Sequence, residues 1–354
     1  MLLGFIAACN NNNSTTSGDN TDSSKRNDTA DTAKTQATLE LVFSDSTYQL
    51  TGVAKETGGK LLVNYPKWSG PYKYAVVVDS PGKPYANNMK WVCVQSVYFD
   101  DKGDLWILDP AAPKLKKIQG EARLVKMNKA NNTAERTYSF NSIIPDTAYM
   151  NDVRVDTKIN YAYLTESKGG GIVVVDLASG KMRRLLSNHP STKSDPSFKY
   201  IIDGHELMKD GKPARFNSDG IALSPDGDWL YYKAITDDRL YRIRTQFLRD
   251  SSMSDSSVGQ HVQDLGHFAS TDGMIFDSKG NLYLGDPRTY SIIKISPDLK
   301  MTTVIKDERL IWPDSYSIAD GYLYISCSQI NKQPDFNEGV NKRTTPYTVY
   351  RLKL

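Results

Sequence analysis

The stretch DGMIFDSKGNLYL, residues 272–284, contains the unit that decides the fold. An aspartate opens the unit, a short apolar run follows, Lys279-Gly280 supplies a turn, and a second run begins at Leu282. Glycine accepts the positive φ angles of tight hairpin turns without steric cost, and aromatic and β-branched residues favour strands. The stretch is therefore predicted to form a β-hairpin that starts at a polar side chain.

The same unit recurs along the chain, which makes the sequence a repeat. The other copies occupy residues 51–63, 95–107, 151–164, 219–232 and 314–325. Further strand-like runs follow several of these hairpins, as at residues 171–176 and 291–295. Four short strands in each unit, repeated radially, are typical of β-propeller blades.

We therefore predict an all-β fold, a six-bladed β-propeller over residues 39–354. Residues 39–43 and 348–352 are both strand-like, and we expect them to share one blade and close the ring. A β-sandwich with similar strands does not explain one repeated six-residue element.

The side chains at one polar position of the repeat are expected to meet around the axis of this fold. The first strand of a blade lies innermost, so residues at one offset share one height around the axis. Two positions before the first apolar residue, the copies carry Thr51, Gln95, Asn151, Asp219, Asp272 and Asp314. Asp-Gly steps also form ordinary turns, but the equal offset in every copy favours a ring. We predict that Gln95, Asn151, Asp219, Asp272 and Asp314 bind a ligand.

Carboxylates that face one another repel, so they need a cation, a shared proton or a bound ligand. Oxygen ligands suit a hard divalent cation such as Ca²⁺ or Mg²⁺, and Asn151, Asp219 and Asp272 are the predicted metal ligands. An amine would pair with the acids directly and make the metal unnecessary. The sequence leaves both possibilities open.

Catalysis would need a base beside such a site. Asp152 and Asp314 are candidates for the base, and His205 is a candidate acid/base group, although a lone loop histidine is more often structural. The sequence contains no nucleophile elbow and no phosphate-binding loop.

The N-terminal residues are typical of export. Residues 1–9 contain a short apolar run that ends in Ile6-Ala7-Ala8-Cys9, which resembles a bacterial lipobox with Cys9 as the lipidated residue. Residues 10–38 are almost entirely polar and are predicted to be a disordered tether. No Lys or Arg precedes the apolar run, and the alternative is an apolar start on a cytosolic protein. We expect an exported protein, lipid-anchored to a bacterial membrane.

The net charge and the lengths of the apolar stretches limit the kinds of partner that the protein can bind. The formal net charge is only +3, with basic residues scattered among acids, so we expect no nucleic-acid surface. No apolar stretch reaches the length of a membrane span, so the anchor is the expected membrane contact. We expect a monomer with a small-molecule ligand. Beyond Cys9, only Cys93 and Cys327 remain, either as a bridge or as two separate buried thiols.

The chain also resembles the royal jelly/yellow family. The resemblance extends from about residue 40 to the end, and its motifs include NDVRVD at 151–156, GIVVVDL at 171–177, SDGIALSP at 218–225 and WPDS at 312–315. It implies an exported six-bladed propeller. Some members bind small aromatic amines in the axial channel, and others are linked to dopachrome isomerisation.

A more distant similarity is to gluconolactonase-like propellers, which are metal-dependent lactonases with a Glu, Asn, Asn, Asp ligand ring. Here those places hold Gln95, Asn151, Asp219 and Asp272, so two of the four match. Three functions compete: a binding protein for an aromatic, amine or cyclic molecule, a lactone hydrolase or dopachrome-type isomerase, and an interaction scaffold. The binding protein is the first hypothesis, and the scaffold is the least favoured, because a scaffold has no need of acids around its axis.

Overall fold

The computed structural model describes residues 37–68, 72–86 and 88–354. The expected leader, Cys9 and nearly all of the predicted tether lie outside the described residues. Residues 37–354 form one compact unit.

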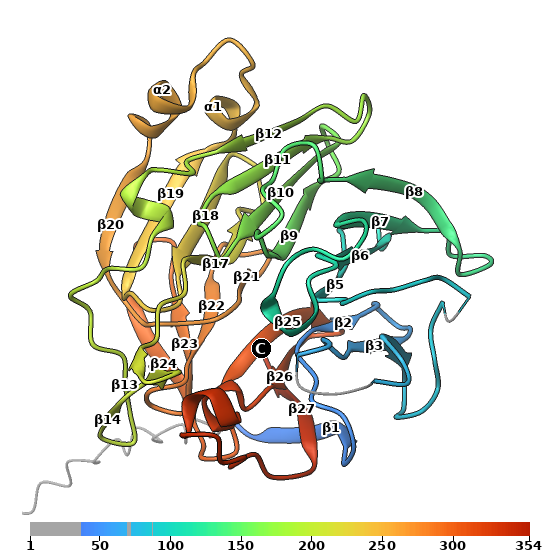
Figure 1. Ribbon diagram of the computed structural model, residues 1–354, viewed down its shortest axis with the longest axis vertical. Coiled ribbons are helices and arrows are strands. Elements are labelled where there is room, and N and C mark those ends of the chain that lie inside the picture. The colour runs from blue at the N-terminus through green and yellow to red at the C-terminus, as the bar shows by residue number, and fades with distance from the viewer. Residues whose placement is uncertain (1–36, 69–71, 87) are drawn as a thin grey trace, which may run out of the picture. The chain divides into compact units, whose positions relative to one another are not determined.

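Within the described residues, six antiparallel sheets surround one axis (Figure 1), which confirms the predicted six-bladed β-propeller. From the axis outward, the first three blades are β2 (Val53–Lys55), β3 (Leu61–Asn64) and β4 (Val76–Val78); β5 (Ser96–Phe99), β6 (Leu105–Asp109), β7 (Arg123–Met127) and β8 (Ala134–Ser139); and β9 (Met150–Asp156), β10 (Tyr161–Glu166), β11 (Ile172–Asp176) and β12 (Met182–Leu185).

The other three blades are built in the same order. They are β17 (Ser218–Leu223), β18 (Trp229–Ala234), β19 (Arg239–Arg244) and β20 (Gln263–His267); β21 (Met274–Phe276), β22 (Leu282–Asp286), β23 (Ser291–Ile295) and β24 (Met301–Lys306); and β25 (Pro313–Ala319), β26 (Tyr322–Cys327), β27 (Tyr347–Lys353) and β1 (Leu39–Asp45).

The inner strands contact one another in a closed cycle, β2 to β5, β9, β17, β21, β25 and back to β2. The ring closes where the first strand joins the last blade, since β1 pairs antiparallel with β27 and Leu39 lies opposite Leu352. The expectation that both ends of the repeat region share one blade is confirmed.

Short elements lie in the connections between the strands of a blade and between two of the blades. The long connection from β12 to β17 contains η2 (Pro190–Thr192) and the small hairpins β13 (Ile201–Ile202)–β14 (His205–Glu206) and β15 (Met208–Lys209)–β16 (Lys212–Pro213). The remaining ones are η1 (Pro113–Leu115), α1 (Thr245–Arg249), α2 (Asp255–Gly259), η3 (Ile330–Lys332) and η4 (Pro334–Phe336). No helix in the described part of the chain has the length and apolar character needed to cross a membrane.

The hydrophobic core lies between neighbouring blades. Each pair of adjacent blades encloses its own buried cluster; for example, Trp106 and Leu124 of one blade pack with Val153 and Val173 of the next. Another cluster is described below. Cys93 and Cys327 are both buried and free, so they are two separate thiols.

Removal of an apolar side chain from the closing strand tests this architecture. Phe43 on β1 is 4% exposed and belongs to the cluster shared by the first and last blades, whereas Leu41 on the same strand is 55% exposed. We expect Phe43→Ala to lower the free energy of unfolding by about 3–5 kcal/mol, because it leaves a cavity in this cluster. Leu41→Ala is the matched control and should change it by less than about 0.5 kcal/mol. Chemical unfolding curves measure both; equal effects would contradict the role of β1.

Candidate functional site

The inner strands place the repeated polar residues around the axis. We call Thr51, Gln95, Asn151, Asp219, Asp272 and Asp314 the upper ring. Asn151, Asp219 and Asp314 lie near the starts of β9, β17 and β25, and the other three precede β2, β5 and β21 by one or two residues. All are buried except Asn151, which is partly exposed.

Hydrogen bonds link the upper ring from blade to blade. The Tyr149 hydroxyl donates to Gln95 Oε1 at 2.7 Å, and Gln95 Nε2 donates to Asn151 Oδ1 at 3.4 Å. Asn151 Nδ2 donates to Asp219 Oδ2, and Asp219 in turn shares a hydrogen bond with Asp272. The structure therefore brings Gln95, Asn151, Asp219 and Asp272 together, although they lie far apart in the sequence.

The acids of the upper ring are held in an unfavourable environment for negative charge. Burial raises the pKa of Asp219 well above its usual value, and the charge of Asp272 raises it further. Burial also raises the pKa of Asp314, again with help from the charge of Asp272. The pKa of Asp272 rises to about 6 through burial, although hydrogen bonds with Trp312 and Asp219 oppose the shift.

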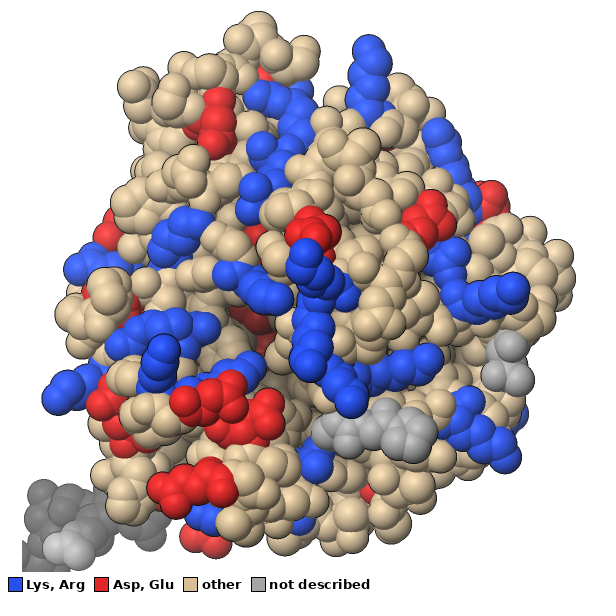
Figure 2. Space-filling model, viewed as in Figure 1, with Lys and Arg blue, Asp and Glu red and all other residues tan. Residues whose placement is uncertain are grey.

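No positive side chain compensates these acids within the described ranges, since no lysine or arginine there forms an ion pair with Asp219, Asp272 or Asp314. Figure 2 shows one face of the molecule, on which acidic atoms lie deep in a central hollow and lysine and arginine side chains surround it. The upper ring is thus ready for a proton or a cation.

Several buried polar atoms near the upper ring have no hydrogen-bond partner among the described residues. Two of them are Oδ2 of Asp314 and the hydroxyl of Tyr200, whose pKa is raised by burial and, to a smaller extent, by the charges of Asp286 and Asp272. An unpaired buried polar group costs about 1–3 kcal/mol, so such groups are rare outside binding and catalytic sites. Both are available to a ligand.

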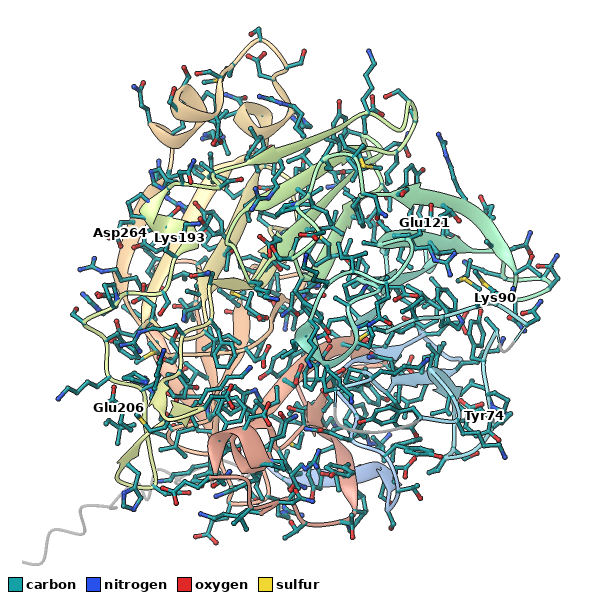
Figure 3. All side chains as sticks on the ribbon, viewed as in Figure 1. Tyr74, Lys90, Glu121, Lys193, Glu206 and Asp264 are labelled. Carbon is teal, nitrogen blue, oxygen red and sulfur yellow. The ribbon has the colours of Figure 1, made fainter. Side chains whose placement is uncertain are left out.

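An aromatic cluster, which we call the aromatic lid, lies next to the upper ring. Its members come from loops of several blades and are Trp68, Phe198, Tyr200, Phe216, Trp312 and Phe336. Three of them lie on the β12–β17 connection, where Lys193 and Glu206 are labelled in Figure 3. The lid contacts the ring directly, because Trp312 Nε1 donates to Asp272 Oδ2 at 2.6 Å. It also contacts the ring through Tyr149, since Trp68 Nε1 donates to the Tyr149 hydroxyl at 2.9 Å and that hydroxyl donates to Gln95.

The glycines that follow Asp219 and Asp272 show whether these Asp-Gly steps form ordinary turns. Gly220 lies in β17 and Gly273 immediately precedes β21, both without positive φ, whereas Gly227 and Gly321 have φ values of 85° and 77°. A Cβ at Gly220 would overlap the backbone oxygen of Asp272, and one at Gly273 would overlap that of Asp314. These two glycines therefore permit neighbouring inner strands to approach closely, and the second pair forms turns.

The other candidates have different surroundings. Asp152 accepts from Ser96 Oγ at 2.9 Å and pairs with Arg154 Nη1 at 2.9 Å, so its charge is already compensated. His205 is exposed on β14 and lines a separate surface hollow, whose described lining includes no upper-ring residue. The structure does not bring His205 to the ring, because the β13–β14 hairpin holds it outside the propeller sheets.

The predicted metal ligands Asn151, Asp219 and Asp272 lie next to one another in the upper ring. Of the side chains that the structure describes, no three His, Cys, Asp or Glu residues gather closely enough to hold a metal ion. Asn151, Asp219 and Asp272 instead use their polar atoms for hydrogen bonds with one another. This arrangement suits a ligand that brings its own donors.

The raised pKa of Asp272 predicts an unusual pH dependence of stability. Because the folded pKa of about 6 lies above the ordinary value of 3.8, the folded protein binds more protons between these pH values, and stability falls as pH rises through 6. We expect Asp272→Asn to stabilise the protein at pH 8 by up to about 3 kcal/mol and to have little effect at pH 4. Asp226→Asn, on an exposed turn, is the control. Unfolding at both pH values measures this; an equal effect of Asp272→Asn at pH 4 and pH 8 would refute the assignment.

Solved structures of other propellers share the fold at low sequence identity. A luciferin-regenerating enzyme aligns with a TM-score of 0.55 and 14% identity, covering 90% of this chain and 95% of that one. A gluconolactonase from Xanthomonas campestris aligns with a TM-score of 0.50 and 11% identity, covering 90% of each chain. At these identities the likeness concerns the fold alone.

Comparison of sequences is more specific than comparison of folds. Major royal jelly protein 1 of Apis mellifera is 26% identical over 246 residues, which cover 64% of this chain and 51% of that protein. Major royal jelly protein 7 of the same species is 26% identical over 242 residues, covering 64% and 49%. The chain thus spans about half the length of these curated relatives. The family model of the major royal jelly proteins matches residues 92–353, and the chain belongs to this family.

Proposed function

We propose that the protein binds a small organic cation, an amine with an aromatic or other apolar body, in the upper part of its axial channel. The observation that carries the proposal is the set of three buried acids, Asp219, Asp272 and Asp314, which lack a positive partner among the described residues. An ammonium group would compensate their charge and donate hydrogen bonds to them.

The aromatic lid supports the same ligand class. Trp312 and Tyr200 lie with their ring centroids 6.0 Å apart, and Trp312 reaches Asp272 directly. Aromatic faces attract cations within about 6 Å and also accept an apolar ligand body. The unpaired oxygen of Asp314 and the Tyr200 hydroxyl would supply the remaining polar contacts.

The hydrogen bonds of the upper ring favour binding over hydrolysis. A metal-assisted lactonase needs a cation to polarise a carbonyl and a base to activate water. Asp152, one candidate base, is ion-paired with Arg154, and Asp219 is hydrogen-bonded on both sides. Ca²⁺ or Mg²⁺ in place of the amine remains the alternative cation.

Calorimetry with 2-phenylethylamine at pH 7.5 tests this proposal. We expect binding to the wild type, and binding at least tenfold weaker to Asp272→Asn and Asp219→Asn, because each loses a buried charge-assisted contact. Asp226→Asn removes an equivalent charge from an exposed turn and should bind like the wild type. The neutral analogue 2-phenylethanol should bind at least tenfold more weakly than the amine.

Other outcomes would overturn the proposal that the protein binds an amine. Equal affinity for the amine and the alcohol, or no change in either ring variant, would remove the ammonium site. Binding of CaCl₂ or MgCl₂ that the ring variants abolish, without amine binding, would assign the acids to a metal. Turnover of a lactone or of dopachrome that depends on Asp272 would make the protein an enzyme.

We also propose that the protein is exported and anchored through a lipid on Cys9. The apolar run of residues 2–8 before Cys9 and the polar segment after it support this. Expression of the full chain in bacteria with a labelled fatty acid should label the protein and place it in the membrane fraction. Cys9→Ser should abolish both; label that persists in this variant would disprove the anchor.

A further inference from the structure

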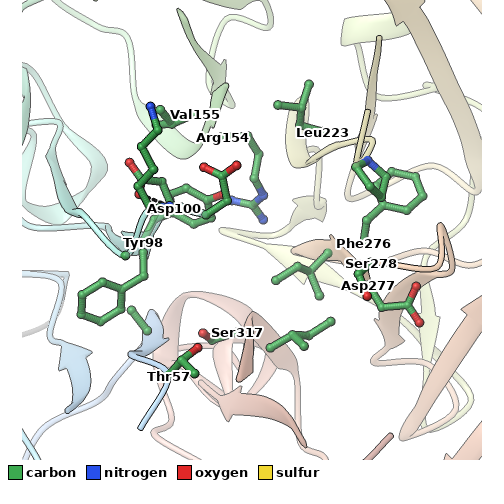
Figure 4. A pocket seen from close by; sticks show the side chains of 18 of the residues that line it. Thr57, Tyr98, Asp100, Arg154, Val155, Leu223, Phe276, Asp277, Ser278 and Ser317 are labelled. Atoms are coloured by element: carbon green, nitrogen blue, oxygen red, sulfur yellow. Dashed lines mark hydrogen bonds between the residues drawn. The ribbon is translucent and has the colours of Figure 1, made fainter. Parts of the chain in front are cut away.

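The opposite end of the axial channel contains a second cavity, of about 970 Å³. The inner strands and the hairpin turns that follow them line this lower cavity (Figure 4). None of the upper-ring residues is among its described lining residues. The size lies in the usual range of small-molecule sites, about 300–1,000 Å³.

The repeat that creates the upper ring also creates a ring here. Four positions after each upper-ring residue stand the members of what we call the lower ring: Lys55, Phe99, Val155, Leu223, Phe276 and Ile318. All of them line the lower cavity, and all except Val155 are partly exposed. Five are apolar, so five of the six blades contribute an apolar side chain to this part of the cavity, which we call the throat. Charged residues such as Glu56, Asp101 and Lys158 also line the cavity.

Arg154 lies at the inner end of this throat. Arg154 is 5% exposed, and Figure 4 shows its side chain reaching toward the middle of the cavity. Nη1 contacts the Val153 backbone oxygen at 2.6 Å and Asp152 Oδ2 at 2.9 Å, and Nη2 donates to the Met274 backbone oxygen at 2.7 Å. The guanidinium is thereby fixed between the third and fifth blades.

One donor of this fixed group is left over. Arg154 Nε is buried and has no hydrogen-bond partner within the part of the chain described. Tyr98 flanks the guanidinium at 5.2 Å from ring centroid to Cζ and is itself a lining residue. The acids nearest the rim are occupied; Asp100, for example, accepts from Trp106 Nε1 and two backbone amides of its turn. These acids therefore do not accept a hydrogen bond from Arg154 Nε.

We propose that the lower cavity binds an apolar carboxylate, with the carboxylate at Arg154 and its hydrocarbon or aromatic body along the lower ring. A single remaining N–H suits one carboxylate better than a phosphate, which needs several donors. Phe99, Leu223 and Phe276 in the throat would pack against the apolar body of the ligand. This site is independent of the amine site above.

Calorimetry with sodium octanoate and with octanamide tests the proposal, because the two probes share an apolar body and differ in charge. We expect octanoate to bind the wild type at least tenfold more tightly than octanamide does. Ile318→Glu places a negative charge in the throat and should weaken octanoate at least tenfold, whereas the isosteric neutral variant Ile318→Gln should stay within threefold of the wild type.

Arg154 is tested together with Asp152, since the loss of one partner alone would leave a buried charge and endanger the fold. The double variant Asp152→Asn/Arg154→Met should bind octanoate no more tightly than octanamide. Melting curves check that each variant folds, and Ile318→Glu should still bind 2-phenylethylamine like the wild type. Equal affinities for octanoate and octanamide, equal behaviour of Ile318→Glu and Ile318→Gln, or no octanoate binding at millimolar concentration would each overturn the proposal.

Discussion

The convergence of six inner strands on one axis is the constraint on which the rest of the molecule depends. Residues at one offset in the repeat must share one height, so their side chains meet whatever their chemistry. Asp219 and Asp272 cannot separate as surface acids would, and they share a hydrogen bond instead. The approach of the strands is so close that Gly220 and Gly273 leave no room for a Cβ. The electrostatic repulsion between the buried acids at the axis is thus a direct consequence of the fold.

The ion pair of Asp152 and Arg154 divides the channel into two environments of opposite character. The two residues lie on one inner strand, two positions apart, and their charged atoms are 2.9 Å apart. Above them, the charge of Asp152 contributes to the raised pKa of Asp219, Asp272 and Asp314. Below them, Arg154 Nε is a donor without a partner among the described residues, next to the cavity that the lower ring lines. One side of the pair therefore favours cations, and the other favours an anion with an apolar body.

The repeat made the fold and the upper ring predictable, because both follow from spacing alone. The apolar runs and glycine turns predicted the hairpins, and the common offset predicted that Gln95, Asn151, Asp219, Asp272 and Asp314 meet around the axis. The lower ring lies at an equally regular offset, yet Phe99 or Phe276 in a strand reads as ordinary core, so periodicity gave no reason to single it out. The pairing of Asp152 with Arg154 depends on side-chain direction, and the distance of His205 from the ring depends on where a hairpin folds. Neither is encoded in local sequence pattern.

The aromatic lid depends on one strained residue, which no spacing rule reveals. Trp312 has a φ of 56°, in the left-handed region that a bulky side chain rarely adopts, and is only 1% exposed. Such strain persists only where the surroundings determine the conformation; here the Trp312 backbone oxygen accepts from Ser328 N at 3.1 Å, and its indole donates to Asp272 at 2.6 Å. The indole bond stabilises the ionised form of Asp272 and so lowers its pKa against the effect of burial. A lid that only excluded solvent would need no such bond. Trp312 therefore joins the two parts of the site, since this residue of the aromatic lid also lowers the pKa of one ring acid and so favours its negative charge.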